Sequence, residues 1–157
     1  MNKALSLWCL AMTLSGALFF WAVPAFATLG GTVDSIQADA KTLSATMGPA
    51  ANLGSYTIYT LTSTATTLRE YVSPSGVVFA LAWNGLFQPE VTPLLGSYAG
   101  EYQQALQSSP RQPGVRSSFV VKASRVVVER WGHMRNMQGR AYAPDLVPQG
   151  VSLDAIR

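Results

Sequence analysis

Apolar and polar positions recur with recognisable periods along most of this chain. Residues Tyr56 to Thr62 are rich in threonine, tyrosine and isoleucine, which is typical of a strand. Two more β-rich runs, Leu68–Val72 and Val77–Trp83, flank the sequence Ser-Pro-Ser-Gly at positions 73–76. Because a type I turn favours serine first, proline second and glycine fourth, these runs predict a hairpin. A further β-rich region extends from Ser118 to Tyr142.

Two other segments have the period of a helix. Thr32 can cap a short helix that Gly48-Pro49 would end, with apolar positions at Val33, Ile36, Ala40 and Leu43. Thr92 can cap a longer helix with Pro93 at its first position. Its apolar stripe, which would face a sheet, consists of Leu94, Leu95, Tyr98, Tyr102, Ala105 and Leu106.

Together these elements predict an α+β fold in a single small domain. We expect an antiparallel sheet of about five strands, with one main helix packed on a face and a short N-terminal helix. From about residue 143, Pro144, Pro148 and Gly150 predict an irregular tail.

The first 27 residues have the pattern of a secretory signal peptide. Lys3 is followed by a nearly uncharged run, Ala4–Val23, and then by Pro24 and Ala25-Phe26-Ala27. We therefore predict cleavage after Ala27, with residues 28–157 exported to the periplasm or the extracellular space. The alternative is an uncleaved membrane anchor, because Ala4–Val23 has about the ~20 residues that span a bilayer. Pro24 and the Ala-x-Ala pattern favour cleavage.

Composition restricts the chemistry that is available. The single cysteine, Cys9, lies in the leader, which excludes a disulfide scaffold and a thiol nucleophile in the exported part. His133 is the only histidine, and no acidic residue stands at metal-motif spacing from it. There is also no phosphate-binding loop or dinucleotide fingerprint. We therefore expect neither a metal nor another cofactor.

Charge is unevenly distributed along the chain. Residues 28–106 carry two basic side chains against five acidic ones, and residues 107–157 carry eight basic against three acidic. Such asymmetry can mark an anion-binding surface, and for an exported protein the anions would be envelope components rather than nucleic acid. Alternatively, the two halves pack together and neutralise each other.

The basic half contains a candidate binding surface. If Gly132-His133 is a two-residue turn, Arg125 faces Arg140 and Arg130 faces Arg135. Like charges directly opposite each other are unfavourable, so a bound anion or an acidic neighbour would have to compensate. These four arginines and His133 are thus a candidate anion or partner surface. Glu129 and solvent could equally provide the compensation.

Two glycines and three acidic residues are also considered as functional residues. Gly96 and Gly100, four residues apart, would share one face of the second helix and let a partner approach closely, unless they accommodate a local loop. Asp34 and Asp39 are five apart and would not face each other as a catalytic pair. For Glu70 we expect a salt bridge to a neighbouring arginine.

Several segments in a fixed order resemble a known family. They are Ala27 to Gly31, Arg69 to Pro74 with Gly76 to Trp83, Leu94 to Tyr98, and Gly132 to Arg135 with Gly139 to Tyr142. They are similar to the exported bacterial proteins of the domain-of-unknown-function 2844 family (DUF2844). The resemblance covers nearly all of residues 28–157. It implies export and one small domain, and it assigns no catalytic residues.

Three functions remain open at this point. The leading one is a non-enzymatic exported protein that binds or helps assemble an envelope component. The second is a small periplasmic hydrolase with His133 as its base. The third is a membrane-tethered form that keeps its leader. We expect an envelope component or a second copy as the partner, no nucleic acid, and membrane contact only through the leader.

Overall fold

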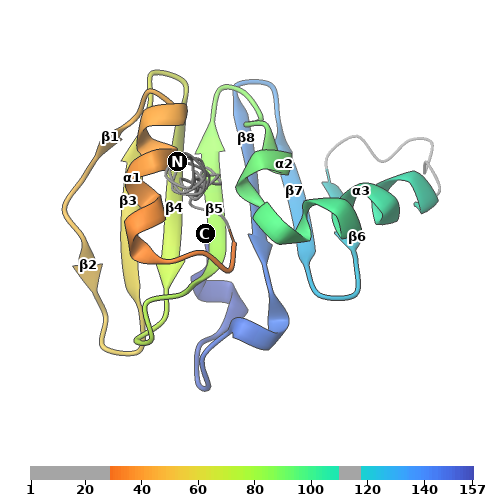
Figure 1. The fold of residues 1–157 in the computed structure, drawn as a ribbon. Helices are drawn as coiled ribbons and strands as arrows, with labels where there is room; N and C mark the ends of the chain where they lie inside the picture. The colour runs from red at the N-terminus through yellow and green to blue at the C-terminus, as the bar shows by residue number, and fades with distance from the viewer. Residues whose placement is uncertain (1–28, 110–117) are drawn as a thin grey trace, which may run out of the picture.

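The computed structural model describes residues 29–109 and 118–157, and an antiparallel sheet runs through both ranges. The strands lie in the order β1-β3-β4-β5-β8-β7-β6, and β2 also pairs with β3 (Figure 1). Their bounds are β1 Thr46–Met47, β2 Ala51–Asn52, β3 Thr57–Thr62, β4 Thr66–Val72, β5 Val78–Gly85, β6 Ser118–Lys122, β7 Val127–His133 and β8 Asn136–Tyr142. The antiparallel α+β fold is confirmed. The expected number of about five strands is too low, because the sheet has eight.

The hairpin of β4 and β5 forms at the predicted turn. The Gly76 amide donates to the Ser73 carbonyl over 2.9 Å, and the Ser73 amide donates to the Val77 carbonyl over 2.9 Å. Gly76 has a φ of 81°, which a side chain would disfavour. β5 is central in the sheet, and its residues Val78–Trp83 are all buried because both faces of the strand are covered.

The first helix, α1 (Val33–Thr42), lies over β3 and β4, and Ile36 is fully buried beneath it (Figure 1). It follows Thr32, as predicted. It ends well before Gly48, because the chain turns at Ser44, where φ is 48°, and then enters β1. The predicted helix end was therefore wrong.

The second helical region is broken rather than continuous. It consists of α2 (Val91–Leu94), a 3₁₀ turn (Gly96–Tyr98) and α3 (Ala99–Ser108). Gly96 interrupts it with a φ of 52°, outside the range of a right-handed helix. Thr92 lies inside α2 rather than capping it, because Glu90 is the N-cap residue. Of the predicted apolar stripe, Leu94, Leu95, Tyr98 and Tyr102 are buried against the sheet, whereas Leu106 is exposed.

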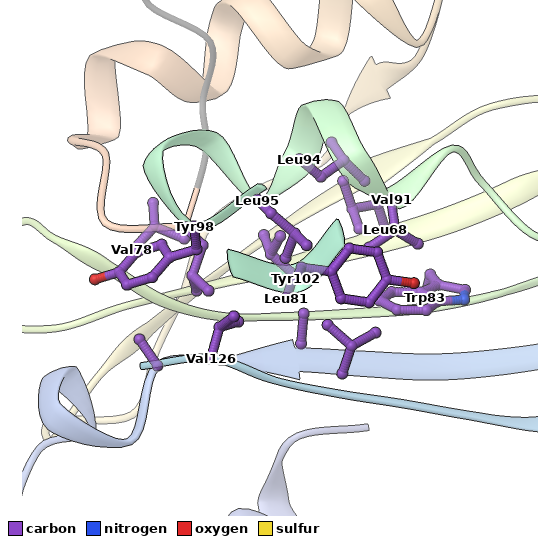
Figure 2. Close-up of a cluster of buried hydrophobic side chains, with 14 of the residues drawn as sticks. Leu68, Val78, Leu81, Trp83, Val91, Leu94, Leu95, Tyr98, Tyr102 and Val126 are labelled. Carbon is purple, nitrogen blue, oxygen red and sulfur yellow. The ribbon is translucent and has the colours of Figure 1, made fainter. Parts of the chain in front are cut away.

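The main core lies between the helices and one face of the sheet. Figure 2 shows side chains from α2, the 3₁₀ turn and α3 directed at the strands, where Tyr102 lies beside Trp83 of β5. The segment that precedes α1 joins this core. Leu29 is 1% exposed, and its amide donates to the Leu94 carbonyl over 3.0 Å.

A smaller core covers the opposite face, and the end of the chain closes it. Phe79 contacts Tyr56 and Tyr71 edge to ring, with centroids 6.1 and 6.2 Å apart. Ile156 is completely buried in the same cluster. The tail beyond residue 143 contains two 3₁₀ turns, Pro144–Leu146 and Leu153–Ala155. It is irregular in outline, as expected, but it is packed as part of the domain.

The hairpin of β7 and β8 turns two residues later than predicted. His133 pairs with Asn136, so Met134 and Arg135 form the turn, and Arg135 takes a φ of 66°. Gly132 lies within β7, where an added Cβ would be 2.1 Å from the Asn136 carbonyl oxygen. Glycine is therefore needed at position 132 for this close approach and for its φ of 112°, although the residue lies outside the two-residue turn.

The predicted pairings of arginines are therefore wrong. Arg140 lies opposite Glu129, and Arg130 lies opposite Gly139. The partner of each β7 residue moves by four positions, which is an even number, so the shift leaves every side chain of β7 and β8 on the face that the predicted register would give it. Val128 and Gly139 point to the helices, and Glu129 and Arg140 point away from them.

Candidate functional site

The four candidate arginines lie in three separate places. Arg125 and Arg130 contact the helical region, Arg140 lies on the opposite face of the sheet, and Arg135 is at the tip of the β7–β8 hairpin. The structure therefore does not bring them together as one basic surface. Binding by any of them individually stays a prediction.

Arg125 is engaged with α3. Its Nε donates to Glu101 over 2.7 Å, and its guanidinium lies 5.1 Å from the centre of the Tyr98 ring. Ser124 donates to the other carboxylate oxygen of Glu101 over 2.9 Å. The hydrogen bonds from Arg125 and Ser124 hold the pKa of Glu101 below its ordinary value. This contact neutralises charge between the acidic and basic parts of the chain.

Arg130 lies under α3, on the face of the sheet that carries the main core. Its guanidinium donates to the Tyr102 hydroxyl and lies 5.7 Å from the centre of that ring. Because the side chain is half-buried and engaged with Tyr102, it is poorly placed to hold an external anion.

Arg140 is the candidate arginine that lines a groove. It makes an ion pair with Glu129 over 2.7 Å and donates to the Leu153 carbonyl over 2.5 Å. Its guanidinium also lies 5.9 Å from the centre of the Trp131 ring. The Trp131 indole donates to the Gln138 side-chain oxygen over 3.1 Å. These contacts hold four side chains of β7 and β8 in fixed orientations on the face of the sheet away from the helices, namely Glu129, Trp131, Gln138 and Arg140.

The C-terminal segment forms the other wall of the same groove. The groove has a volume of about 410 Å³. It is lined by Glu129, Trp131, Gln138, Arg140, Asp154, Ile156 and Arg157. Tyr71 and Arg69 of β4 anchor this wall through hydrogen bonds to the Arg157 carbonyl of 2.9 and 2.7 Å. We call this feature the tail groove. The residues that line it include two with carboxylate and two with guanidinium side chains, so their side-chain charges balance.

A second hollow lies at one end of the sheet, beside the β7–β8 tip. It has a volume of about 230 Å³ and is lined by residues 63–67 and 84–86 together with Arg135 and Asn136. Large apolar side chains next to it are exposed, namely Leu86 at 47%, Phe87 at 69% and Met134 at 94%.

Glu70 does not form the expected salt bridge. It is fully buried between β4 and α1, where it faces Asp39 of the helix instead of an arginine. Burial, reinforced by the charge of Asp39, raises the pKa of Glu70 from its ordinary value near 4.5 to about 9. The neutral acid is therefore the form that the folded chain holds at neutral pH. This acidic pair is enclosed in the fold, so it affects stability rather than external chemistry.

His133 is exposed at the end of β7 and lines neither the tail groove nor the hollow beside the β7–β8 tip. The hydrolase with His133 as its base stays a prediction. Among residues 29–109 and 118–157, no three acidic or histidine side chains gather in a way that could hold a metal ion. Within the same ranges, no helix is long and apolar enough to cross a membrane.

Gly96 and Gly100 do not share a face of one helix, because the chain breaks between α2 and α3. Gly96 is explained locally by its positive φ. Gly100 is exposed on α3, and an added Cβ there would meet no atom within 4 Å. A partner contact at Gly100 therefore stays a prediction that rests on that residue alone.

The tail groove was not predicted as a site. Strand alternation already places Glu129, Gln138 and Arg140 on one face. The sequence signal for the second wall is weak, because it consists of one apolar residue, Ile156, at the end of an otherwise irregular tail. This wall is brought to the sheet by tertiary contacts, that of Tyr71 with Arg157 across 86 positions and that of Arg140 with Leu153 across 13.

One comparison with known proteins identifies a family. A model described as a protein of unknown function, DUF2844, matches residues 25–156. Neither the curated proteins nor the solved structures include a significant match. The family match covers most of the chain, from the last residues of the predicted leader to the buried Ile156, and it confirms the resemblance that the sequence motifs indicated. The chain belongs to the DUF2844 family.

Proposed function

We propose that this chain is an exported, non-enzymatic binding protein of the bacterial cell envelope, and that the tail groove holds its ligand. The pattern of residues 1–27 supports export. The observation that carries the binding role is the tail groove itself, which combines an indole with polar side chains that the fold has already oriented. Binding sites for small ligands have this composition of an apolar surface with a few placed polar groups.

Charge balance within the groove indicates the class of ligand. Glu129 and Asp154 offset Arg140 and Arg157, and Glu129 and Arg140 are paired with each other. A strongly anionic ligand would meet two carboxylates there, which is unfavourable. An uncharged ligand with many hydroxyl groups, such as a glycan strand, could exchange hydrogen bonds with the paired side chains and place its C–H groups against the Trp131 ring.

The test uses residues 28–157, which contain every member of both core clusters. The probe is the soluble, uncharged tetramer of β-1,4-linked N-acetylglucosamine, and binding is measured by titration calorimetry. We expect Trp131→Ala to weaken binding about tenfold or more, because it removes the ring surface. The matched control is Leu106→Ala, which changes an exposed apolar residue of α3 and should bind like the wild type.

Three outcomes contradict parts of the proposal. No heat of binding at millimolar glycan would exclude this ligand class. Equal binding by Trp131→Ala and the wild type would place the site elsewhere. Cleavage of the tetramer, followed by mass spectrometry, would show that the protein is an enzyme.

A further inference from the structure

Three connections lie together at one end of the sheet. They are the β3–β4 turn at residues 63–65, the β5–α2 segment at residues 86–90, and the β7–β8 tip at Met134-Arg135 (Figure 1). We call this region the loop end. The turns that join β2 to β3, β4 to β5 and β6 to β7 lie at the opposite end.

Large apolar side chains are held exposed at the loop end. Phe87 is 69% exposed and Leu86 is 47% exposed, although their backbone is fixed to the neighbouring turn. The Leu86 amide donates to the Ala65 carbonyl over 2.8 Å, and the Thr66 hydroxyl donates to the Phe87 carbonyl over 3.3 Å. Met134, at 94% exposure, projects from the two-residue turn of the other hairpin. Exposed apolar groups that gather in this way mark surfaces for proteins or membranes.

A hollow with mostly polar lining residues lies at the loop end, and Leu86 and Arg135 are among the residues that line it. The residues that line the 230 Å³ cavity include four with hydroxyl groups, two asparagines and one arginine, namely Ser63, Thr64, Thr66, Thr67, Asn84, Asn136 and Arg135. No carboxylate is among its lining residues. The Ser63 and Thr66 hydroxyls donate within the fold, to the Thr66 and Phe87 carbonyls. The Thr64 and Thr67 hydroxyls, the asparagine amides and the Arg135 guanidinium are the donor types that suit a phosphate group.

We propose that the loop end docks on the surface of an anionic phospholipid bilayer. Arg135 and the hydroxyl-lined hollow take a lipid phosphate, while Phe87, Leu86 and Met134 enter the boundary between the headgroups and the acyl chains. The two features lie side by side, as the phosphate layer and the acyl boundary do in a bilayer. A protein partner would account for the apolar side chains, but not for a hollow of phosphate-binding character beside them. The inference goes beyond the proposed glycan binding and rests on different residues.

The test is co-sedimentation of residues 28–157 with vesicles, because the apolar run of the leader would bring any chain to a membrane. Vesicles of phosphatidylglycerol and phosphatidylethanolamine in equal parts are compared with vesicles of phosphatidylcholine alone. We expect binding to the anionic vesicles that falls with added salt. Phe87→Ala combined with Met134→Ala should weaken it about tenfold or more. Arg135→Gln should weaken binding to the anionic vesicles, and inorganic phosphate should compete only weakly.

Matched controls lie at the opposite end of the sheet. Leu53→Ala changes an apolar residue of 57% exposure, and Lys122→Gln removes an exposed charge. Both should bind vesicles like the wild type. All these positions are exposed, so circular dichroism should show the same fold in every variant.

Other outcomes overturn the bilayer proposal. One is a wild-type chain that stays in the supernatant with every vesicle. Another is a double variant that binds as well as the wild type. If vesicles are not bound, but the chain dimerises in sedimentation velocity and the double variant does not, the occupant is a second copy. Trp131→Ala should leave vesicle binding unchanged, which separates this test from that of the tail groove.

Discussion

Gly139 of β8 lies directly opposite Trp83 of β5, and a methyl group on Gly139 would be 2.3 Å from Cζ2 of the indole. The same methyl group would be 2.6 Å from the Glu129 carbonyl oxygen of the next strand. Trp83 is 2% exposed and belongs to the main core, which Figure 2 shows. The glycine therefore provides the space in which the largest side chain of the main core packs.

Gly139→Ala should destabilise the fold by about 1–3 kcal/mol, because the indole and a strand backbone must both move. The control is Gly100→Ala, which has free space around it and removes a glycine from α3. That variant should be about 0.5–1 kcal/mol more stable than the wild type. Urea unfolding measures both. A Gly139→Ala variant as stable as the wild type would show that Trp83 does not occupy this position.

Glu70 should make stability fall as the pH rises. Its pKa is about 9 in the folded chain and near 4.5 when unfolded, so the folded state binds the proton more tightly. The stabilising contribution is complete below pH 4.5 and is lost as the pH rises through about 9. Melting temperatures between these limits should therefore decline with pH. Glu70→Gln, which mimics the neutral acid, should flatten the decline.

The control for the Glu70 variant is a substitution of Glu101, an acidic residue whose pKa is lowered rather than raised. The pKa of Glu101 is lowered, chiefly by the hydrogen bond from Arg125, so Glu101 stays ionised over the same pH range. Glu101→Gln should leave the decline unchanged. If the melting temperature of Glu70→Gln fell with pH as steeply as that of the wild type, Glu70 would not be a buried protonated acid in the folded chain.

Ile156 should contribute to stability although it is the penultimate residue. Its side chain is completely buried in the second core cluster, so Ile156→Ala should cost about 2–4 kcal/mol. Leu153→Ala, in the same segment but 36% exposed, should cost clearly less. Thermal unfolding compares the two. Equal effects would mean that the tail is not packed on the sheet.

The exported protein should begin at Thr28. Cleavage after Ala27 would leave Leu29 free to take its buried place, with its amide bonded to Leu94. N-terminal sequencing of the protein from the cell envelope should read Thr-Leu-Gly-Gly. A mature form that retains Met1 would instead support the tethered alternative.

The sequence by itself determined the local elements of this fold. Ser73-Pro74-Ser75-Gly76 specified its hairpin because each residue suits its turn position, and the period of residues 33–43 specified α1. Strand alternation assigned Glu129 and Arg140 to the face away from the helices, and this survived an error in register because the error was an even number of residues. The family motifs were likewise legible in the sequence.

The tertiary structure alone decided which residues meet across long separations. Glycine at position 132 looked like a turn residue, but it lies within β7, where the close approach of Asn136 and a φ of 112° require it. Glu70 was expected beside an arginine and lies beside Asp39, because α1 packs over β4. The tail groove exists because Tyr71 and Arg69 hold the chain end across the sheet. Such contacts depend on how whole elements pack, and no short window of sequence contains that information.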